Sequence, residues 1–186
     1  MSTTTAPATL TGTYTLDPAH SRVGFVARHA MVTKVRGSFN EFEGSGTFDA
    51  DNPSNSHLQL TIQAASIDTR NADRDGHLKS NDFFDMETYP TITFVSTAVE
   101  QTGDTDYRVT GDLTIKGVTK PVTVDFDYTG TAVDPYDNQR IGFEGKTTVN
   151  RKDWGVSWNA ALEAGGVLVS EKVTLEFEVS AIRNEA

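Results

Sequence analysis

Cysteine is absent from this sequence of 186 residues, which excludes disulfide bonds, thiolate nucleophiles and cysteine metal sites together. Positive charge is also scarce, because 16 Lys and Arg stand against 26 Asp and Glu and give a formal net charge of −10. A nucleic acid partner is therefore not expected, since binding to phosphates requires a cationic surface. No apolar run approaches the roughly 18 residues that a membrane-spanning helix needs, so no transmembrane segment is expected either.

Residues 1–12 contain no charged side chain, and threonine is their commonest residue. The segment has neither the basic part nor the apolar part of a secretion signal. We therefore predict a short disordered N-terminal lead over residues 1–12. Without an export signal, the expected location is cytoplasmic.

Apolar and polar side chains alternate along most of the chain. In Val122–Tyr128 the apolar residues alternate with Thr and Asp, and in Val173–Val179 they alternate with Thr and Glu. A period of two predicts strands that have one buried and one solvated face. Glycines between such segments predict hairpin turns at Lys116-Gly117 and near Glu43-Gly44.

Roughly eight to ten such strands, each with one apolar face, must either form a sandwich or close into a barrel. Closure is favoured because it removes exposed sheet edges. A barrel of about eight strands can be filled by its own side chains or can hold one small ligand, and the alternation alone leaves both possibilities open. No repeat or linker divides the chain, so a single all-β domain over residues 13–183 is predicted.

The stretch near residues 70–85 interrupts the strand pattern and is predicted to be a short helical insertion. Asn71 is its predicted N-cap, and acidic residues in a first helical turn are favoured by the helix dipole. Asp73 and His77 would share one face of that helix, so together with Asp75 they are a candidate metal-dependent or hydrolytic site. Capping and salt bridging explain the same residues, and we favour that interpretation.

A hydrolase triad is a further candidate, because Asp17, His20 and Ser21 supply its residue types. His20 and Ser21 are neighbours, so in an extended chain their side chains point to opposite faces. The sequence also lacks a Gly-x-Ser-x-Gly elbow. We therefore expect both residues to satisfy backbone groups in a turn.

An ordered set of motifs, spread over nearly the whole chain, resembles the YceI-like polyisoprenoid-binding family. The motifs are Asp17–Phe25 (DPAHSRVGF), His29, Gly37–Phe39 (GSF), Ile67–Asn71 (IDTRN), Arg74–Leu78 (RDGHL), Asp82–Asp85 (DFFD), Tyr89-Pro90, Phe94, Gly111–Thr119 (GDLTIKGVT) and Arg151–Gly155 (RKDWG). No single motif is specific, but their order is.

This resemblance implies an extended antiparallel, lipocalin-like β-barrel whose apolar channel binds a polyisoprenoid or an isoprenoid quinone. It implies no enzymatic activity, no metal and no cofactor, and homodimer formation is an expectation that rests on the resemblance alone. The residues expected to line the channel are Phe25, Phe39, Leu60, Ile62, Phe83, Phe84, Ile92, Phe94, Leu113, Ile115, Phe126, Phe143, Trp154 and Phe177. The residues expected near the ligand head group are Arg28, His29, Arg74 and His77.

Overall fold

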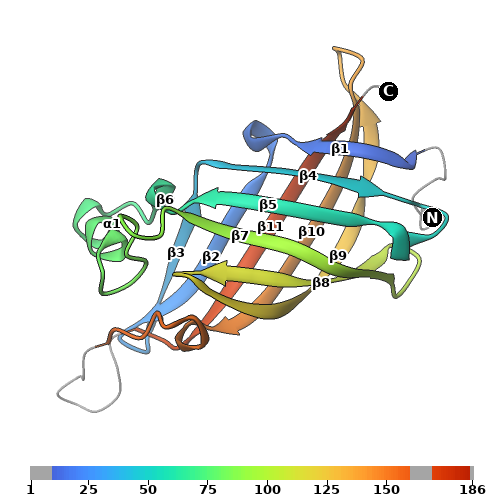
Figure 1. The fold of residues 1–186 in the computed structure, drawn as a ribbon. Coiled ribbons are helices and arrows are strands. Elements are labelled where there is room, and N and C mark those ends of the chain that lie inside the picture. The colour runs from blue at the N-terminus through green and yellow to red at the C-terminus, as the bar shows by residue number, and fades with distance from the viewer. Residues whose placement is uncertain (1–9, 160–168, 185–186) are drawn as a thin grey trace.

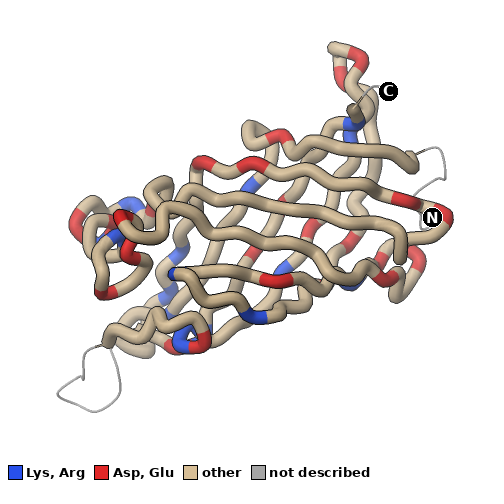
Figure 2. Tube along the Cα trace, in the orientation of Figure 1, with Lys and Arg blue, Asp and Glu red and all other residues tan. Residues whose placement is uncertain are grey.

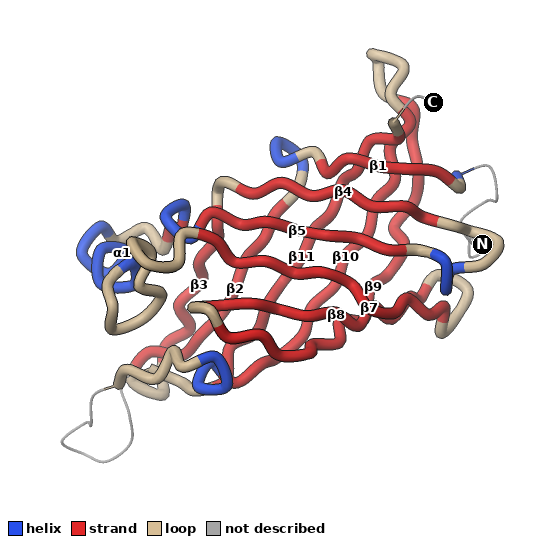
Figure 3. Tube along the Cα trace, in the orientation of Figure 1, coloured by secondary structure: helices blue, strands red, loops and turns tan. Residues whose placement is uncertain are grey.

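The computed structural model describes residues 10–159 and 169–184. These residues form one antiparallel sheet with a single α-helix and short 3₁₀ turns between strands. Figure 3 shows strand along almost all of the wall, with the helical segments in the connections. The elements are β1 (Gly12–Leu16), β2 (Arg22–His29), β3 (Thr33–Phe39), β4 (Phe42–Phe48), β5 (His57–Gln63), β6 (Ile67–Asp68), α1 (Ala72–Lys79), β7 (Thr91–Gln101), β8 (Asp106–Ile115), β9 (Val118–Val133), β10 (Gln139–Asn150), β11 (Lys172–Arg183), η2 (Pro18–His20), η3 (Pro53–Asn55), η4 (Ala64–Ser66) and η5 (Arg151–Trp154).

Eight of the strands close into a ring in the order β1-β4-β5-β7-β8-β9-β10-β11, and β11 pairs back onto β1 (Figure 1). The closing pairs include Tyr14 with Arg183 and Leu16 with Ala181. The predicted all-β antiparallel barrel, with its short helical insertion, is confirmed.

The remaining strands, β2, β3 and β6, extend the wall beyond this ring. One edge of β11 is divided between two partners, because Thr174–Glu178 pair with β2 whereas Ala181–Arg183 pair with β1. The 3₁₀ turn η2 makes the corner between β1 and β2. The chain from β1 to β2 therefore acts as one bent strand of the barrel. Its neighbours in the wall are β4, which pairs with β1, and β3, which pairs with β2.

The barrel has two ends that serve as landmarks below. The helix end carries α1, η5 and the turns β2–β3 and β8–β9 (Figure 1). The terminus end carries the first and last described residues and the turns β7–β8 and β9–β10. In the described part of the chain, no helix is both long and apolar enough to span a membrane.

The helix α1 begins where the sequence predicts. The Asn71 side chain accepts a hydrogen bond from the Arg74 backbone N–H at 3.0 Å, which is the expected N-cap contact. The Asp75 carboxylate accepts from the backbone N–H of Thr69 at 2.9 Å and from its hydroxyl at 2.5 Å. The acidic first turn therefore ties the helix to the strand end that precedes it.

Of the two predicted hairpin turns, one is confirmed and one is wrong. Lys116 and Gly117 both have positive φ (53° and 74°), as a type I′ turn between β8 and β9 requires. The strand β4, in contrast, runs straight through Glu43 and Gly44, and the chain turns before Phe42. A glycine can also occupy a strand interior where another group needs the space, and the sequence pattern cannot distinguish this from a turn.

The predicted N-terminal lead ends earlier than expected. Leu10 is buried, with 3% of its surface exposed, and its carbonyl accepts a hydrogen bond from the Tyr14 hydroxyl at 2.6 Å. The strand β1 begins at Gly12. Residues 10–12 are therefore part of the barrel, and residues 1–9 of the predicted lead lie outside the described residues.

Candidate functional site

The interior of the barrel is hollow and apolar along its length. One cavity of about 180 Å³ lies toward the terminus end and is lined by residues such as Tyr14, Tyr107 and Phe143. A second cavity of about 140 Å³ lies toward the helix end and is lined by residues such as Phe83 and Trp154. Four residues border both cavities and form a waist between them: Leu60, Phe94, Val124 and Phe177. The two cavities therefore adjoin each other inside the barrel, and together they are called the channel below.

The channel stays open because phenylalanine rings lie flat against the wall. A Cβ atom added at Gly37 would lie 2.3 Å from Cζ of Phe25, the residue paired with it across β2 and β3. The same arrangement joins Gly145 to Phe126, where the added Cβ would lie 2.6 Å from the ring. A glycine beneath each ring leaves room for it at the wall, so the ring does not cross the channel.

All fourteen residues that the sequence predicts for the channel wall border one or both cavities. Phe126 and Phe143 border the terminus-end cavity, and Leu60, Phe94 and Phe177 form part of the waist. The others border the helix-end cavity: Phe25, Phe39, Ile62, Phe83, Phe84, Ile92, Leu113, Ile115 and Trp154.

Aromatic side chains close the helix end of the channel. The Phe83 side chain is 5% exposed, and its ring centroid lies 5.3 Å from that of Trp158. Phe84 packs edge-on against Phe39 at 6.1 Å. The Trp154 indole is 2% exposed, and its N–H donates to the Leu113 carbonyl at 2.8 Å. The segments that follow α1 and β10 thus both supply apolar plugs at this end.

The four predicted head-group residues lie elsewhere, and in the described part of the chain none of them borders either cavity. Arg28 and His29 are exposed at the end of β2. The Arg74 side chain donates to the Thr69 hydroxyl and carbonyl at 2.7 and 2.6 Å. His77 is 2.8 Å from Asp82 and packs edge-on against the rings of Phe83 and Trp158.

Arg151 is a charged residue of the channel wall that the pattern of the strands does not reveal. It borders the helix-end cavity and is 7% exposed. Its guanidinium donates to the carbonyls of Ser170, Val156 and Val169 at 2.8, 2.6 and 3.3 Å. Burial lowers the pKa of Arg151, and the nearby Glu171 carboxylate offsets part of this. Arg151 is the first residue of the RKDWG motif, so the resemblance to the family included it. The motif gave no reason to place the side chain in the channel.

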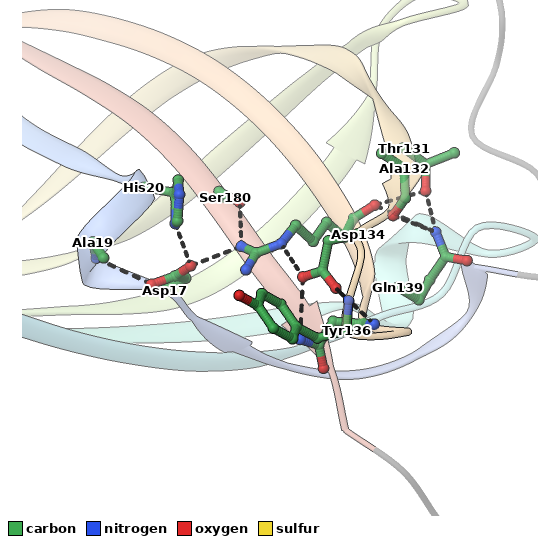
Figure 4. Close-up of polar contacts among 11 residues, drawn as sticks. Asp17, Ala19, His20, Thr131, Ala132, Asp134, Tyr136, Gln139 and Ser180 are labelled. Carbon is green, nitrogen blue, oxygen red and sulfur yellow. Dashed lines mark hydrogen bonds and ion pairs between the residues drawn. The ribbon is translucent and has the colours of Figure 1, made fainter.

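At the terminus end, Arg140 joins three parts of the chain. Its Nη1 lies 2.7 Å from Asp17 Oδ2 and its Nε lies 2.8 Å from Asp134 Oδ2. Nη1 also donates to the Ser180 hydroxyl at 3.3 Å, and Figure 4 shows these groups converging from β11, η2 and the β9–β10 turn. Arg140 therefore fastens the barrel where β1 and β11 meet.

The two carboxylates at Arg140 are held in their charged form. The hydrogen bond from Arg140 is the main cause that lowers the pKa of Asp17, and His20 adds to it. Burial raises the pKa of Asp134, but hydrogen bonds from Arg140 and Asn138 outweigh it and hold this pKa well below its ordinary value. Both carboxylates thus contribute stability above about pH 4, and this contribution is lost as the pH falls through their folded-state pKa values.

An Arg140→Met variant is expected to melt on the order of 5 °C below the wild-type protein near neutral pH, because two partly buried carboxylates lose their partner. The difference should shrink below about pH 4, where the carboxylates take up protons. Circular dichroism melts over a pH series measure both effects. Arg108→Met is the matched control, since the Arg108–Asp125 pair is exposed and should change the melting temperature little. A loss that is the same at every pH would contradict this account.

Most of the candidate catalytic groups are engaged in structural contacts, and Asp73 is exposed in the first turn of α1. Asp75 is hydrogen-bonded to Thr69 and His77 to Asp82, and no group of three or more His, Cys, Asp or Glu in the described ranges could hold a metal ion. The Ser21 hydroxyl donates to the Ser180 carbonyl at 3.1 Å. His20 instead lies 2.7 Å from Asp17 (Figure 4). Nothing in this geometry favours the alternative of a metal-dependent or hydrolytic enzyme.

Known proteins share this architecture. A family model described as the YceI-like domain matches residues 14–181. The UPF0312 protein SAS2572 of Staphylococcus aureus (strain MSSA476) is 40% identical over 169 residues, which cover 90% of this chain and 95% of that protein. The crystal structure of BcnA from Burkholderia cenocepacia is similar with a TM-score of 0.79 at 29% identity, covering 89% of this chain and 98% of that one. A polyisoprenoid binding domain from Saccharophagus degradans is similar in fold, with a TM-score of 0.67 at 17% identity over 92% of this chain and 98% of that one.

Proposed function

Because the chain belongs to the YceI-like domain family, we propose that it binds a polyisoprenoid lipid or an isoprenoid quinone inside its barrel. It carries or stores this ligand and catalyses no reaction on it. The observation that supports this most is the pair of adjoining apolar cavities, which share the waist of Leu60, Phe94, Val124 and Phe177. A linear prenyl chain can pass from one cavity to the other and stay in contact with apolar side chains.

Burial of the prenyl chain supplies most of the affinity. Each Å² of apolar surface removed from water contributes about 25 cal/mol, which is about 0.8 kcal/mol for each buried CH₂ group. Most of the channel wall is built from Phe, Leu, Ile and Val side chains, which offer apolar contact and few hydrogen bonds. Such a wall favours a long hydrocarbon over a compact polar ligand. The similar Saccharophagus degradans protein is described as a polyisoprenoid binding domain, which supports the same ligand class.

We assign the polar end of the ligand to the helix end of the channel. Arg151 borders the cavity there, and each of its terminal nitrogens has a second N–H beyond the one that donates to Val156 or Val169. A carbonyl, hydroxyl or phosphate oxygen can accept from such a group. This assignment replaces Arg28, His29, Arg74 and His77 as the proposed head-group contacts.

Protein purified from its own host is expected to carry a prenyl lipid. Native mass spectrometry should show a mass adduct, and organic extraction followed by lipid mass spectrometry should identify a polyprenyl compound or an isoprenoid quinone. Protein that has been unfolded, stripped of lipid and refolded is the control, and it should take up added isoprenoid quinone. Protein that is empty from its host and also takes up no quinone after refolding would contradict the proposal.

A further inference from the structure

The hairpin formed by β2 and β3 has a charge opposite to that of the rest of the protein. Residues 18–40 contain Arg22, Arg28, Lys34 and Arg36 and no Asp or Glu, within a chain of net charge −10. In Figure 2 these two strands show Lys and Arg alone, whereas Asp and Glu lie at both ends of the barrel, including the segment around α1. The protein therefore has one element by which it can approach a negatively charged surface.

Three of the four cations of this hairpin have no carboxylate partner, whereas Arg22 lies 4.0 Å from Glu176. Arg28 lies directly opposite Lys34 in the register of β2 and β3. Like charges at facing positions destabilise a strand pair, so the folded protein alone gives no reason for this arrangement. Within residues 10–159 and 169–184, neither of them nor Arg36 forms an ion pair. All three side chains are exposed.

The tip of the hairpin is apolar and exposed. Met31 is 61% and Val32 is 77% exposed, and they are among the most exposed large apolar residues described. Ala30 and Met31 both have positive φ (51° and 63°), and the Val32 N–H donates to the His29 carbonyl at 3.1 Å. This is a type I′ turn, which ordinarily has Asn and Gly at its centre. The turn thus holds the Met31 and Val32 side chains in solvent at the tip of the hairpin.

The part of the hairpin that adjoins its tip contributes to the channel wall. Ala27 borders the helix-end cavity, and so does Val169, which forms a bridge with His29. The Ser170 N–H donates to the Arg28 carbonyl at 3.0 Å and its hydroxyl accepts from the Arg28 N–H at 2.9 Å. Glu171, the next residue, is paired with Lys152 at 2.7 Å. Anything that binds the hairpin is therefore brought to the helix end of the channel.

We propose that the β2–β3 hairpin docks the protein on the surface of an anionic phospholipid bilayer. Met31 and Val32 enter the interfacial region, while Arg28, Lys34 and Arg36 bind the phosphate groups around them. The inference rests on the proposed lipid-binding function, since a bilayer is where a prenyl lipid is collected or delivered. An apolar tip surrounded by cations suits a bilayer better than a nucleic acid, because a nucleic acid would need aromatic side chains for stacking on the bases.

Vesicle flotation tests this docking. The wild-type protein should float with vesicles of equal parts phosphatidylcholine and phosphatidylglycerol, and not with phosphatidylcholine alone, and added salt should weaken the binding. A triple variant, Arg28→Gln with Lys34→Gln and Arg36→Gln, should bind these vesicles at least about tenfold more weakly. Met31→Ser with Val32→Ser should weaken binding as well. The matched control is Arg108→Gln with Lys120→Gln and Lys146→Gln, which makes the same charge change on exposed residues of β8, β9 and β10 and should bind as the wild-type protein does.

Uptake of isoprenoid quinone from detergent, measured without vesicles, separates this inference from the proposed function. Hairpin variants should take up quinone as the wild-type protein does and fail only with vesicles. Equal flotation of the hairpin triple variant and its control would overturn the docking proposal. So would wild-type protein that binds single-stranded RNA or polyglutamate but not the anionic vesicles.

Discussion

A Gly37→Val variant is expected to bind prenyl lipid roughly 100- to 1,000-fold more weakly than the wild-type protein. A side chain at position 37 collides with the Phe25 ring, and all three of the nearest atoms belong to that ring. The ring must then swing off the wall into the helix-end cavity, which it already borders. Excluding a single five-carbon isoprene unit removes about 3–4 kcal/mol of apolar burial, which gives the expected loss.

Quinone fluorescence-quenching titrations measure this loss, and a second variant tests its cause. Adding Phe25→Ala to Gly37→Val removes the displaced ring and should restore much of the binding. Gly76→Ala is the control for a glycine whose replacement meets no atom within 4 Å. It should leave binding unchanged and stabilise α1 by roughly 0.5–1 kcal/mol. Unchanged binding by Gly37→Val would show that Phe25 does not limit the width of the channel.

The largest effect on stability is expected from Trp154→Ala, which should lower the free energy of unfolding by about 3–5 kcal/mol. The indole is 2% exposed in the main apolar cluster, and its hydrogen bond to the Leu113 carbonyl is buried. Truncation leaves a cavity at the plugged end of the channel and a carbonyl without its donor. For a chain of this size the melting temperature should fall by roughly 10 °C.

Chemical denaturation with urea measures this difference, and Trp154→Phe separates its two parts. Phenylalanine keeps most of the apolar volume but cannot donate to Leu113, so it should lose about 1–2 kcal/mol. Lys152→Met, two residues earlier, alters the exposed Lys152–Glu171 pair and should change stability by less than about 1 kcal/mol. If Trp154→Ala were as mild as Lys152→Met, the indole could not be the plug of the helix end.

The barrel and its lining could be predicted because the alternation of apolar and polar residues in a strand determines which side chains face the interior. Side chains two residues apart share a face, so Leu60 and Ile62, or Phe94 and Ile92, had to face the same interior. The Asn71 cap was readable for a similar reason, since capping depends on residues next to each other in sequence. The hollow interior was not readable from this pattern. It depends on which ring covers which glycine across two strands, as Phe25 covers Gly37.

The position of Arg151 and the role of Gly44 could not be predicted either, because both depend on contacts between segments that are far apart in sequence. Arg151 is buried because the carbonyls of Val156, Val169 and Ser170 surround it, and two of these follow it by 18 or 19 residues. Gly44 lies within β4 and not in a turn. The Leu16 side chain packs closely against β4 at this position, where a glycine leaves room for it. Contacts of this kind depend on the closed ring and have no local signature.

The division of β11 between β10, β1 and β2 has a consequence for how the protein is made. Val26 pairs with Thr174 and Tyr14 with Arg183, so the earliest strands wait for one of the last segments to be synthesised. At about 5–20 residues per second, this delay is on the order of ten seconds. Throughout it, the outer edges of β1 and β2 have no partner and can pair with another nascent chain. Pairings this distant in sequence also slow folding itself. The edges of β1 and β2 that later pair with β11 are therefore the part of the barrel most exposed to aggregation during its assembly.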